Sequence, residues 1–427
     1  MTYDDALNFI HSANKFGIKL GLDNIRELLK RLGNPDKDLK FIHIAGTNGK
    51  GTVTSTVASV LMCQGYKVGK YISPFVHIFN ERISVNEQMI SNDSLVKHTA
   101  RVKKACSEMV SDGFTHPTEF EIVTAIGLSY FSAEKCDFVA LEVGMGGRLD
   151  ATNVIDPPLV SVITSISFDH TEYLGDTLPQ IAAEKCGIIK KGSRVAVYPA
   201  QEKEVIQVIA QKCQEVGAEM IIASAPRVLK SDIKETIFDF EEFKGLKLHL
   251  LGEHMVQNVA TAICACKLLR ESGVKISDEA IIKGVDSVRW AGRFEVIAEN
   301  PLMIIDGAHN ISGAAALKGA VLDLLSDKKK IFIMGMLRDK EYEKSLEMLA
   351  PLCDKLITVT VPSPRTLGAQ ELKECALKYA KNVYAAETLC DAAQMALENA
   401  DENTAIVAFG SLYMIGEMKN KLIKKGM

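Results

Sequence analysis

The sequence has no run of apolar residues long enough to span a bilayer, so we expect a protein without membrane-spanning helices. Its first residues lack the basic start and apolar stretch of a secretory signal. The ten cysteines show neither metal-like spacing nor a CxxC pair, which favours free, buried thiols in a reducing cytoplasm. The formal net charge is only -4, so no basic field indicates a nucleic acid partner.

Length and patterning indicate two α/β domains. Apolar residues make up 47% of the 427 residues and charged residues 24%, the profile of a globular protein with room for two cores. Short runs rich in Val and Ile alternate with helical patterns, which predicts parallel sheets covered by helices. The pattern breaks near 291–301 and restarts. We therefore expect a parallel-sheet domain over 1–295 and a smaller doubly wound, Rossmann-like domain over 296–427. Residues 224–247 are expected to form a β-hairpin or loop inserted in the first domain.

The strongest local signal is GTNGKGT at 46–52, between a predicted strand at 41–45 and a helix beginning near Lys50. Phosphate binding needs backbone N–H groups directed at anionic oxygens, and glycine lets the backbone come that close. Lys50 can reach the β- and γ-phosphates, and the Thr52 hydroxyl can face Mg²⁺. The segment predicts a P-loop ATPase-type first domain, although kinases, GTPases, motors and ligases all use such loops.

Two residues follow buried strands of the predicted first sheet. Glu142 ends one strand, directly before a glycine run, where α/β folds place their sites, and Mg²⁺ prefers oxygen ligands. His170 follows the next strand and its loop; taken alone, a histidine there is more often a loop or core residue than a ligand.

Three further residues have both a structural and a functional interpretation. Lys185 lies on a predicted helix, where a solvated lysine on an amphipathic face is the usual finding. Asp306 and His309 follow a strand of the second domain, and they can cap the next helix or belong to a site.

Eleven blocks in order along nearly the whole chain resemble the Mur ligase family, and within it the folylpolyglutamate synthase/dihydrofolate synthase branch. One departure is visible, because Phe75 stands where many members have a histidine after Ser-Pro, with His77 two residues on. The blocks are LGL at 20–22, HIAGTNGKGT at 43–52, SPFVHIFNERI at 73–83, TEFEIVTA at 118–125, LEVGMGGRLDATNV at 141–154, SISFDHTEYLG at 165–175, IAAEKCGIIK at 181–190, LGEHMVQNVATA at 251–262, WAGRFE at 290–295, DGAHN at 306–310 and FGSLY at 409–413.

The resemblance implies a nucleotide site, a metal site and catalytic residues. Two Mg²⁺ ions would be held by Ser73, Glu142 and His170, with Thr52 beside the nucleotide-bound ion. Lys185 would be carbamylated by CO₂, giving anionic oxygens that position the second ion. The implied catalytic residues are Lys185, His170 and His309, and the implied ATP-binding residues are Asn48, Gly49, Lys50, Gly51, Thr52, Asn258, Arg293 and Asp306.

The same resemblance implies a pocket for a pteroate group. Phe120 can stack on a flat heterocycle, and Asp150 can accept hydrogen bonds from the donor edge of a pterin. For Leu20 and Leu22, plain core packing is at least as good an interpretation. The implied lining residues are Leu20, Gly21, Leu22, Thr118, Glu119, Phe120, Leu149, Asp150 and Ala151.

The expected function is that of an ATP- and Mg²⁺-dependent ligase that joins L-glutamate to a folate carboxylate through an acyl phosphate. Tetrahydrofolate, dihydropteroate or both are expected acceptors, and we expect a cytoplasmic monomer. One alternative is a ligase of cell-wall precursors, but such enzymes carry a uridine-binding domain, and only about forty residues precede Gly46. The other is a nucleotide-dependent switch, which the joint presence of Ser73, Glu142, His170 and Lys185 disfavours.

Overall fold

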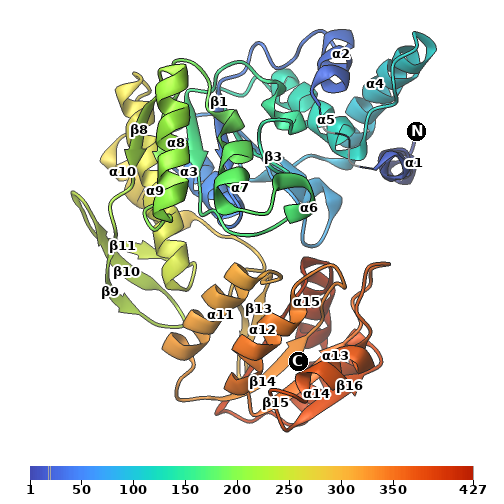
Figure 1. The fold of residues 1–427 in the computed structure, drawn as a ribbon, viewed down its shortest axis with the longest axis vertical. Coiled ribbons are helices and arrows are strands. Elements are labelled where there is room, and N and C mark those ends of the chain that lie inside the picture. Colours follow the sequence, from blue (N-terminus) through green and yellow to red (C-terminus); the bar gives the residue numbers. More distant parts are fainter. Residues whose placement is uncertain (18, 20, 427) are drawn as a thin grey trace. The chain divides into compact units, whose positions relative to one another are not determined.

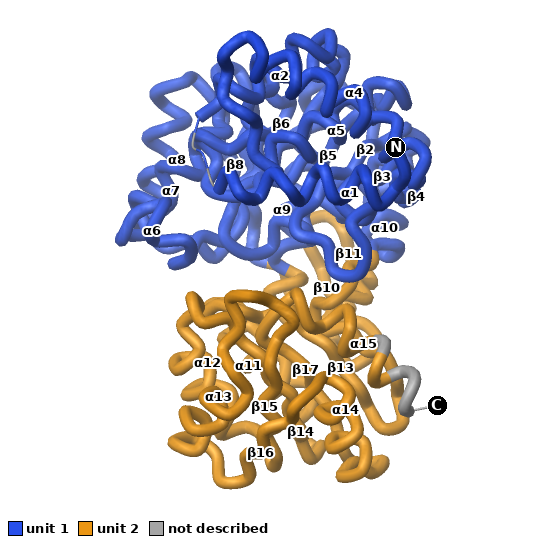
Figure 2. Tube along the Cα trace, turned by 90° about the vertical axis from the view of Figure 1, so that its right-hand side faces the viewer, with its two compact units in different colours: residues 1–225, 257–288 blue, residues 226–256, 289–427 orange. Residues whose placement is uncertain are grey.

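The protein, seen here as a computed structural model that describes residues 1–17, 19 and 21–426, forms two compact units (Figures 1 and 2). The first contains residues 1–225 and 257–288, and the second contains 226–256 and 289–427. Each unit carries its own sheet, so the expected α/β class, with a parallel-sheet first domain and a second α/β domain, is confirmed.

The first unit is built around an eight-stranded sheet that is parallel except for its β3 and β4 edge. Its central strands are buried on both faces, which explains their continuous apolar sequence. In sheet order the strands are β4 (Gln88–Met89), β3 (Ile83–Val85), β2 (Val68–Tyr71), β5 (Phe138–Glu142), β1 (Phe41–Ala45), β6 (Val160–Ile163), β7 (Arg194–Val197) and β8 (Glu219–Ile222).

Helices cover this sheet, and α3 is buried along nearly its whole length, as expected of a helix that is not amphipathic. The first-unit helices are α1 (Tyr3–Ser12), α2 (Asp23–Arg31), α3 (Lys50–Cys63), α4 (Asn92–Ser111), α5 (Glu119–Ala133), α6 (Thr171–Leu174), α7 (Leu178–Lys185), α8 (Lys203–Val216), α10 (Asp278–Ser287) and, from residue 257 on, α9 (Glu253–Glu271). The 3₁₀ turns are η1 (Ala13–Phe16), η2 (Phe79–Arg82), η3 (Ala151–Val154) and η4 (Cys186–Ile188).

The second unit has a six-stranded sheet that is parallel apart from the antiparallel β12–β13 pair. Helices α11 and α12 pack together, as do α14 and α15. The strands, in sheet order, are β12 (Glu295–Glu299), β13 (Leu302–Asp306), β17 (Thr404–Phe409), β14 (Lys329–Met334), β15 (Lys355–Val359) and β16 (Val383–Ala386). The helices are α11 (Ile311–Leu324), α12 (Tyr342–Leu349), η5 (Ala350–Leu352), α13 (Ala369–Ala376), α14 (Leu389–Leu397) and α15 (Leu412–Gly426).

From residue 226 on, the segment expected as a β-hairpin or loop insert groups with the second unit by its contacts. It forms a three-stranded antiparallel sheet, β9 (Arg227–Ser231), β10 (Thr236–Phe240) and β11 (Phe243–Leu248). Ile233 packs against the core of the second unit, and Leu251 is part of that core. These residues thus form an antiparallel sheet, and their assignment to the first domain stays a prediction. The domain boundary at 295/296 stays a prediction.

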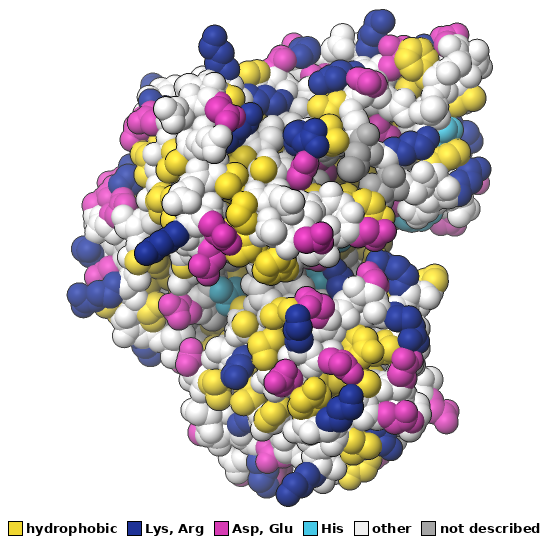
Figure 3. Space-filling view, viewed as in Figure 1, with side chains coloured by type: hydrophobic (Ala, Val, Ile, Leu, Met, Phe, Trp, Pro, Cys, Tyr) yellow, Lys and Arg dark blue, Asp and Glu magenta, His cyan; other side chains and the backbone are white. Residues whose placement is uncertain are grey.

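In the described part of the chain, no helix combines the length and apolar character needed to cross a bilayer. On the face drawn in Figure 3, basic and acidic side chains are interspersed.

Candidate functional site

The loop between β1 and α3 has a backbone that only glycine suits at two points. Gly46 and Gly49 have φ angles of 155° and 85°, in the region that favours glycine. A Cβ on Gly46 would lie 1.8 Å from Thr164 Oγ1, and one on Gly49 would lie 2.2 Å from Asn258 Oδ1. The predicted strand–loop–helix context is present, and the predicted ATP-binding residue Asn258 lies directly against the loop.

The same loop is fastened to the segment that follows β6. Thr47 N donates to Ser165 O over 2.7 Å, and the Thr164 hydroxyl donates to Asn48 O over 2.7 Å. The Thr47 hydroxyl also donates to Ser167 O, three residues before His170. These bonds fix the glycine loop relative to the segment that leads to His170.

Lys50 folds back over its own loop. Its Nζ donates to the carbonyl oxygens of Gly46 and Thr47, over 3.1 and 3.0 Å. Gly51 and Thr52 follow in the first turn of α3, and both are buried. A cation and a helix N-terminus therefore meet at the loop, which is the arrangement that binds phosphate.

Lys185 is not the solvated lysine that its helix pattern favoured. It is only 4% exposed, and its Nζ donates to Gly46 O over 2.7 Å. Burial, and to a smaller extent the charge of Lys50, lowers the pKa of Lys185 to about 7. A large fraction of this amine is therefore neutral near pH 7.

Glu142 ends β5 beside the strand that leads into the phosphate loop, in register with Ile44. It is 3% exposed, and its Oε2 accepts a hydrogen bond of 3.1 Å from Ser73 N. The structure thus brings two of the three predicted metal ligands together. Their oxygen atoms, with the Thr52 hydroxyl, fit the ligand preference of Mg²⁺.

His170, the third predicted ligand, has a left-handed backbone (φ 50°) and a half-exposed ring at the start of α6. Its Nε2 lies 3.9 Å from Asp169 Oδ2. Across residues 1–17, 19 and 21–426, no three His, Cys, Asp or Glu side chains gather closely enough to hold a metal ion. Convergence of His170 with Glu142 on Mg²⁺ therefore stays a prediction.

The predicted substrate residues at 118–120 surround the start of α5. Thr118 is the N-cap of this helix and forms a capping box with Glu121. Glu119 Oε1 lies 3.4 Å from His11 Nδ1, while the buried Glu119 Oε2 has no hydrogen-bond partner among the described residues. The Phe120 ring packs so closely on Gly144, directly after the strand of Glu142, that a Cβ there would lie 2.4 Å from its Cζ.

The other predicted substrate residues divide into core and loop positions. Leu20 lies outside the described residues. Gly21 has a φ of 144°, and Leu22 packs against the core of the first unit, as its core interpretation expected. Leu149 is half-buried, and Ala151 is buried in the same core.

Asp150 accepts three hydrogen bonds from within the protein. It is the N-cap of η3, and its Oδ1 accepts from the Thr152 backbone and hydroxyl, while its Oδ2 accepts from Met145 N over 2.9 Å. Burial raises the pKa of Asp150, and these donors oppose the rise. A contact with a pterin stays a prediction for this carboxylate.

In the second unit, Asp306 accepts hydrogen bonds from the backbone of two nearby loops. Its Oδ2 accepts from Phe294 N and its Oδ1 from Ala308 N, each over 2.7 Å. Burial raises the pKa of Asp306, which the charge of Arg293 opposes. A Cβ on Gly307 would lie 1.8 Å from Arg293 Nη1, so Arg293 and Asp306 lie at the same turn.

The helix that follows is capped by neither of the residues considered for that role. Asn310 is the N-cap of α11, and its side chain accepts from Gly313 N over 2.7 Å. His309 instead places its Nδ1 2.7 Å from Gly307 O. The capping interpretation of Asp306 and His309 was therefore wrong, and their site roles stay predictions.

Two residues escaped the sequence analysis. Arg82 is buried, stands over the rings of Phe79 and Phe120, and has an Nε without a hydrogen-bond partner in the described structure. His43 is buried in β1 and contacts Thr152. Both belong to the resemblance blocks, but only the folded chain shows what they touch.

Comparison with known proteins connects this geometry to a family. The Mur ligase middle domain matches residues 44–266, and the glutamate ligase domain of Mur ligases matches residues 292–412. A dihydrofolate synthase/folylpolyglutamate synthase of Bacillus subtilis is 34% identical over 429 residues, covering 98% of this chain and 99% of that protein. The chain belongs to the folylpolyglutamate synthase/dihydrofolate synthase branch of the Mur ligase family. It is thus a Mur-type, ATP-dependent ligase.

Solved structures of the folylpolyglutamate synthase family share the whole fold. Folylpolyglutamate synthase from Thermotoga maritima is 34% identical, with a TM-score of 0.86 and coverage of 99% of this chain and 97% of that one. Escherichia coli FolC in complex with DHPP and ADP is 30% identical, with a TM-score of 0.87 and coverage of 99% and 98%. The phosphate loop, Glu142 and Lys185 lie in the part that matches the Mur ligase middle domain, and Asp306 lies in the glutamate ligase part.

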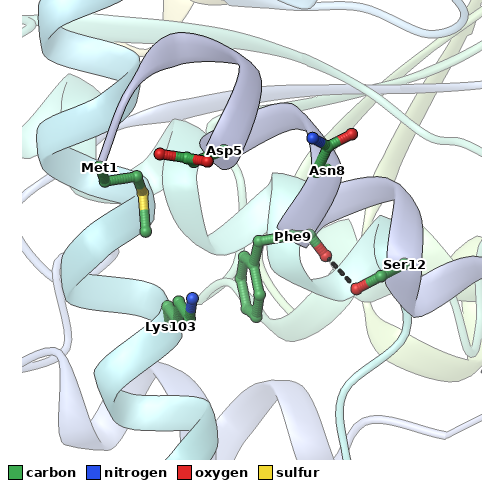
Figure 4. A pocket seen from close by; sticks show the side chains of 6 residues that line it. All are labelled: Met1, Asp5, Asn8, Phe9, Ser12 and Lys103. Carbon is green, nitrogen blue, oxygen red and sulfur yellow. Dashed lines mark hydrogen bonds between the residues drawn. The ribbon is translucent and has the colours of Figure 1, made fainter.

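A surface pocket of about 500 Å³ lies apart from these family motifs, between α1 and α4. Figure 4 shows its lining, in which the Ser12 hydroxyl donates to Phe9 O and Lys103 lies beside the Phe9 ring. Within the described chain its lining includes none of the predicted site residues. Asp5, also on its wall, completes the capping box of α1, so the Asp5 carboxylate already has a structural partner.

Proposed function

We propose that this ligase adds L-glutamate to a folate-type carboxylate, using ATP and Mg²⁺, through an acyl phosphate. The observation that carries the proposal is the phosphate loop itself, on which Lys50 and the buried Lys185 converge at the Gly46 carbonyl. Glu142 stands at the end of the neighbouring strand. Full-length similarity to the Bacillus subtilis protein and to a structure with bound DHPP and ADP supports a folate-type acid and ATP as substrates.

The proposed reaction has two chemical steps. A carboxylate is a poor electrophile, so one of its oxygens first attacks the γ-phosphorus of ATP, and ADP leaves. The glutamate amine then attacks the acyl carbon, the bond to the phosphate oxygen breaks, phosphate leaves and the amine loses a proton. The protein contributes placement and charge neutralisation rather than a nucleophile of its own.

The residues of the first unit have distinct parts in this proposal. The backbone N–H groups of Gly49, Gly51 and Thr52 and the Lys50 amine hold the β- and γ-phosphates. Asn258, which lies against Gly49, bounds the nucleotide site. Ser73, Glu142 and His170, with Thr52, would hold two Mg²⁺ ions, which when bound neutralise charge on the transferred phosphoryl group.

Lys185 is the proposed site of carbamylation. Its neutral amine would attack the carbon of CO₂, an N–C bond would form and one proton would leave, which gives an anionic group in place of a cation. The low pKa of about 7 supports this step, because only the unprotonated amine is a nucleophile. Lys185→Ala should lose activity and recover part of it with added short carboxylates. If Lys185→Ala is fully active without added carboxylates, the carbamylation of Lys185 has no role in catalysis.

The second unit contributes three proposed site residues. Arg293 and Asp306 contact the nucleotide, and His309 acts in catalysis. The adjacency of Arg293 and Asp306 at one turn supports a shared role. Arg293→Ala should raise the KM for ATP more than the KM for the acid, and an unchanged KM for ATP contradicts this part.

The acid pocket is proposed to lie along the first unit. Phe120 would stack on the heterocycle, with Glu119 and Asp150 as polar neighbours. The remaining proposed lining residues are Leu20, Gly21, Leu22, Thr118, Leu149 and Ala151. We also propose a cytoplasmic monomer with ATP, a folate or dihydropteroate, and L-glutamate as its partners.

One experiment tests the proposal as a whole. Purified protein is given dihydropteroate and tetrahydrofolate separately, with ATP, Mg²⁺ and labelled glutamate. Label should enter one or both acids, and phosphate release should need acid, glutamate and Mg²⁺ together. If neither acid is labelled, the folate assignment fails, and phosphate release without an acid favours a nucleotide switch.

A further inference from the structure

His43 is a buried, titratable residue for which the proposed reaction has no use. It lies in the middle of β1, fully buried between β5 and β6. Its Nε2 lies 2.9 Å from the Oγ1 of Thr152, which is 109 residues later in the sequence. Its Nδ1 is buried without a hydrogen-bond partner among the described residues. A strand interior would be better served by an aliphatic side chain, so the histidine is expected to have a task.

The hydrogens of this contact can be assigned from its neighbours. The Thr152 hydroxyl donates its single hydrogen to Asp150 Oδ1, since a carboxylate only accepts. Thr152 Oγ1 must then accept from His43, so His43 carries its hydrogen on Nε2. The pKa of His43 is lowered to about 3 by burial and by the charge of Lys190, so the ring is neutral and donates only there.

The chain of bonds continues to the loop that follows Glu142. Asp150 Oδ2 accepts from Met145 N over 2.9 Å, three residues after Glu142. In the same loop, the Phe120 ring packs against Gly144. A Cβ on Gly147 would lie 2.7 Å from Lys185 O, so the loop also touches the helix of Lys185. Three side chains therefore connect the strand of the phosphate loop to the loop beneath the proposed acid pocket.

We propose that His43 is a positioning residue, which acts through Thr152 and Asp150 to hold the loop at 144–147 in the conformation that binds the acid. The effect on the acid rests on the proposed function, whereas the effect on the loop does not. The other end of η3 is held separately, because Lys190 Nζ donates to Asn153 O over 2.9 Å. Loss of the His43 bond therefore loosens the loop without unfolding the segment.

The test uses four single variants of the full chain and the double variant that combines Thr152→Val with His43→Leu. Thr152→Val keeps the side-chain shape and removes the hydroxyl, and Thr152→Ser keeps the hydroxyl. His43→Leu removes the first donor. His98→Leu is the matched control, because His98 is another buried histidine, whose Nδ1 lies 2.9 Å from Ser129 Oγ between α4 and α5, away from the loop.

Amide hydrogen exchange at Met145 is the first measurement, and it needs no activity. Exchange should become about ten-fold faster in Thr152→Val and in His43→Leu, and stay within about two-fold of wild type in Thr152→Ser and His98→Leu. Unchanged exchange in Thr152→Val overturns the proposal, even where His43→Leu does not fold.

Kinetics are the second measurement. The KM for the acid should rise about ten-fold in Thr152→Val and His43→Leu while the KM for ATP changes less than about two-fold, and the double variant should be no worse than either single one. An equal rise in both KM values indicates general loosening and overturns the positioning role. A wild-type protein without ligase activity refutes the proposed function instead. The exchange experiment then still decides whether His43 holds the loop at 144–147.

Discussion

Replacing Lys185 with methionine should make the free energy of unfolding larger at neutral pH and should remove a pH dependence that the wild type has. The folded-state pKa of about 7 lies below the ordinary lysine pKa of 10.5. Below pH 7 the folded protein therefore carries a buried, protonated amine. This lowers the free energy of unfolding by about 5 kcal/mol, at 1.36 kcal/mol for each pKa unit.

The sign of the pH dependence follows from which state holds the proton. Between pH 7 and 10.5 the unfolded chain binds the Lys185 proton and the folded chain releases it, so the stability of the wild type rises with pH. From pH 7 to 9.5 the wild type should gain about 3 kcal/mol relative to Lys185→Met. The variant loses one hydrogen bond to Gly46 O, which offsets about 1 kcal/mol at every pH.

Urea unfolding of both proteins at pH 7 and 9.5, followed by circular dichroism in CO₂-depleted buffer, measures this difference directly. Other titrating groups are common to both proteins, so they cancel in the comparison. A variant that is less stable than wild type at pH 7, or a gap that does not change with pH, refutes the assignment of a buried amine near neutrality. The variant should also lack ligase activity at both pH values.

Further predictions concern the loop, the core histidine and the strand-end carboxylate. Gly49→Ala should weaken nucleotide binding at least about ten-fold in calorimetry, because the new Cβ would meet Asn258. Gly113→Ala is the control: Gly113 also has a positive φ, but a Cβ there would have no described atom within 4 Å, so this variant should bind nucleotide normally. With a pKa of about 3 against 6.5, His43 stays neutral in the fold, so stability should fall as pH drops from 6.5 towards 3, and acid titration of His43→Leu should show a shallower fall. Glu142→Gln should reduce kcat at least about 100-fold with unchanged circular dichroism, and a variant with normal kcat would remove Glu142 from the site.

The sequence predicted what depends on local pattern. Strand 41–45, the glycine loop and the helix from Lys50 carry their information in adjacent residues, and the structure has them at the expected positions. Glu142 was correctly placed at a strand end because a buried apolar run ends there. Two domains of unequal size follow from the same alternation of strands and helices.

What the sequence did not reveal depends on contacts between distant residues. The burial of Lys185 against Gly46, 139 residues away, cannot be read from a helix pattern that also suits a solvated lysine. The partner of His43 is a threonine 109 residues on. Asn310 rather than Asp306 caps α11, because Asp306 is already engaged by the backbone of Phe294 and Ala308.

The Gly46 carbonyl, shared by two amines, imposes an order of events on the proposed chemistry. A polyanion arriving at the loop favours the protonated form of every nearby amine, so it withdraws the lone pair that Lys185 needs to react with CO₂. Modification of Lys185 would therefore precede nucleotide entry, and protein incubated with bicarbonate before ATP should begin turnover without the lag shown by protein given ATP first.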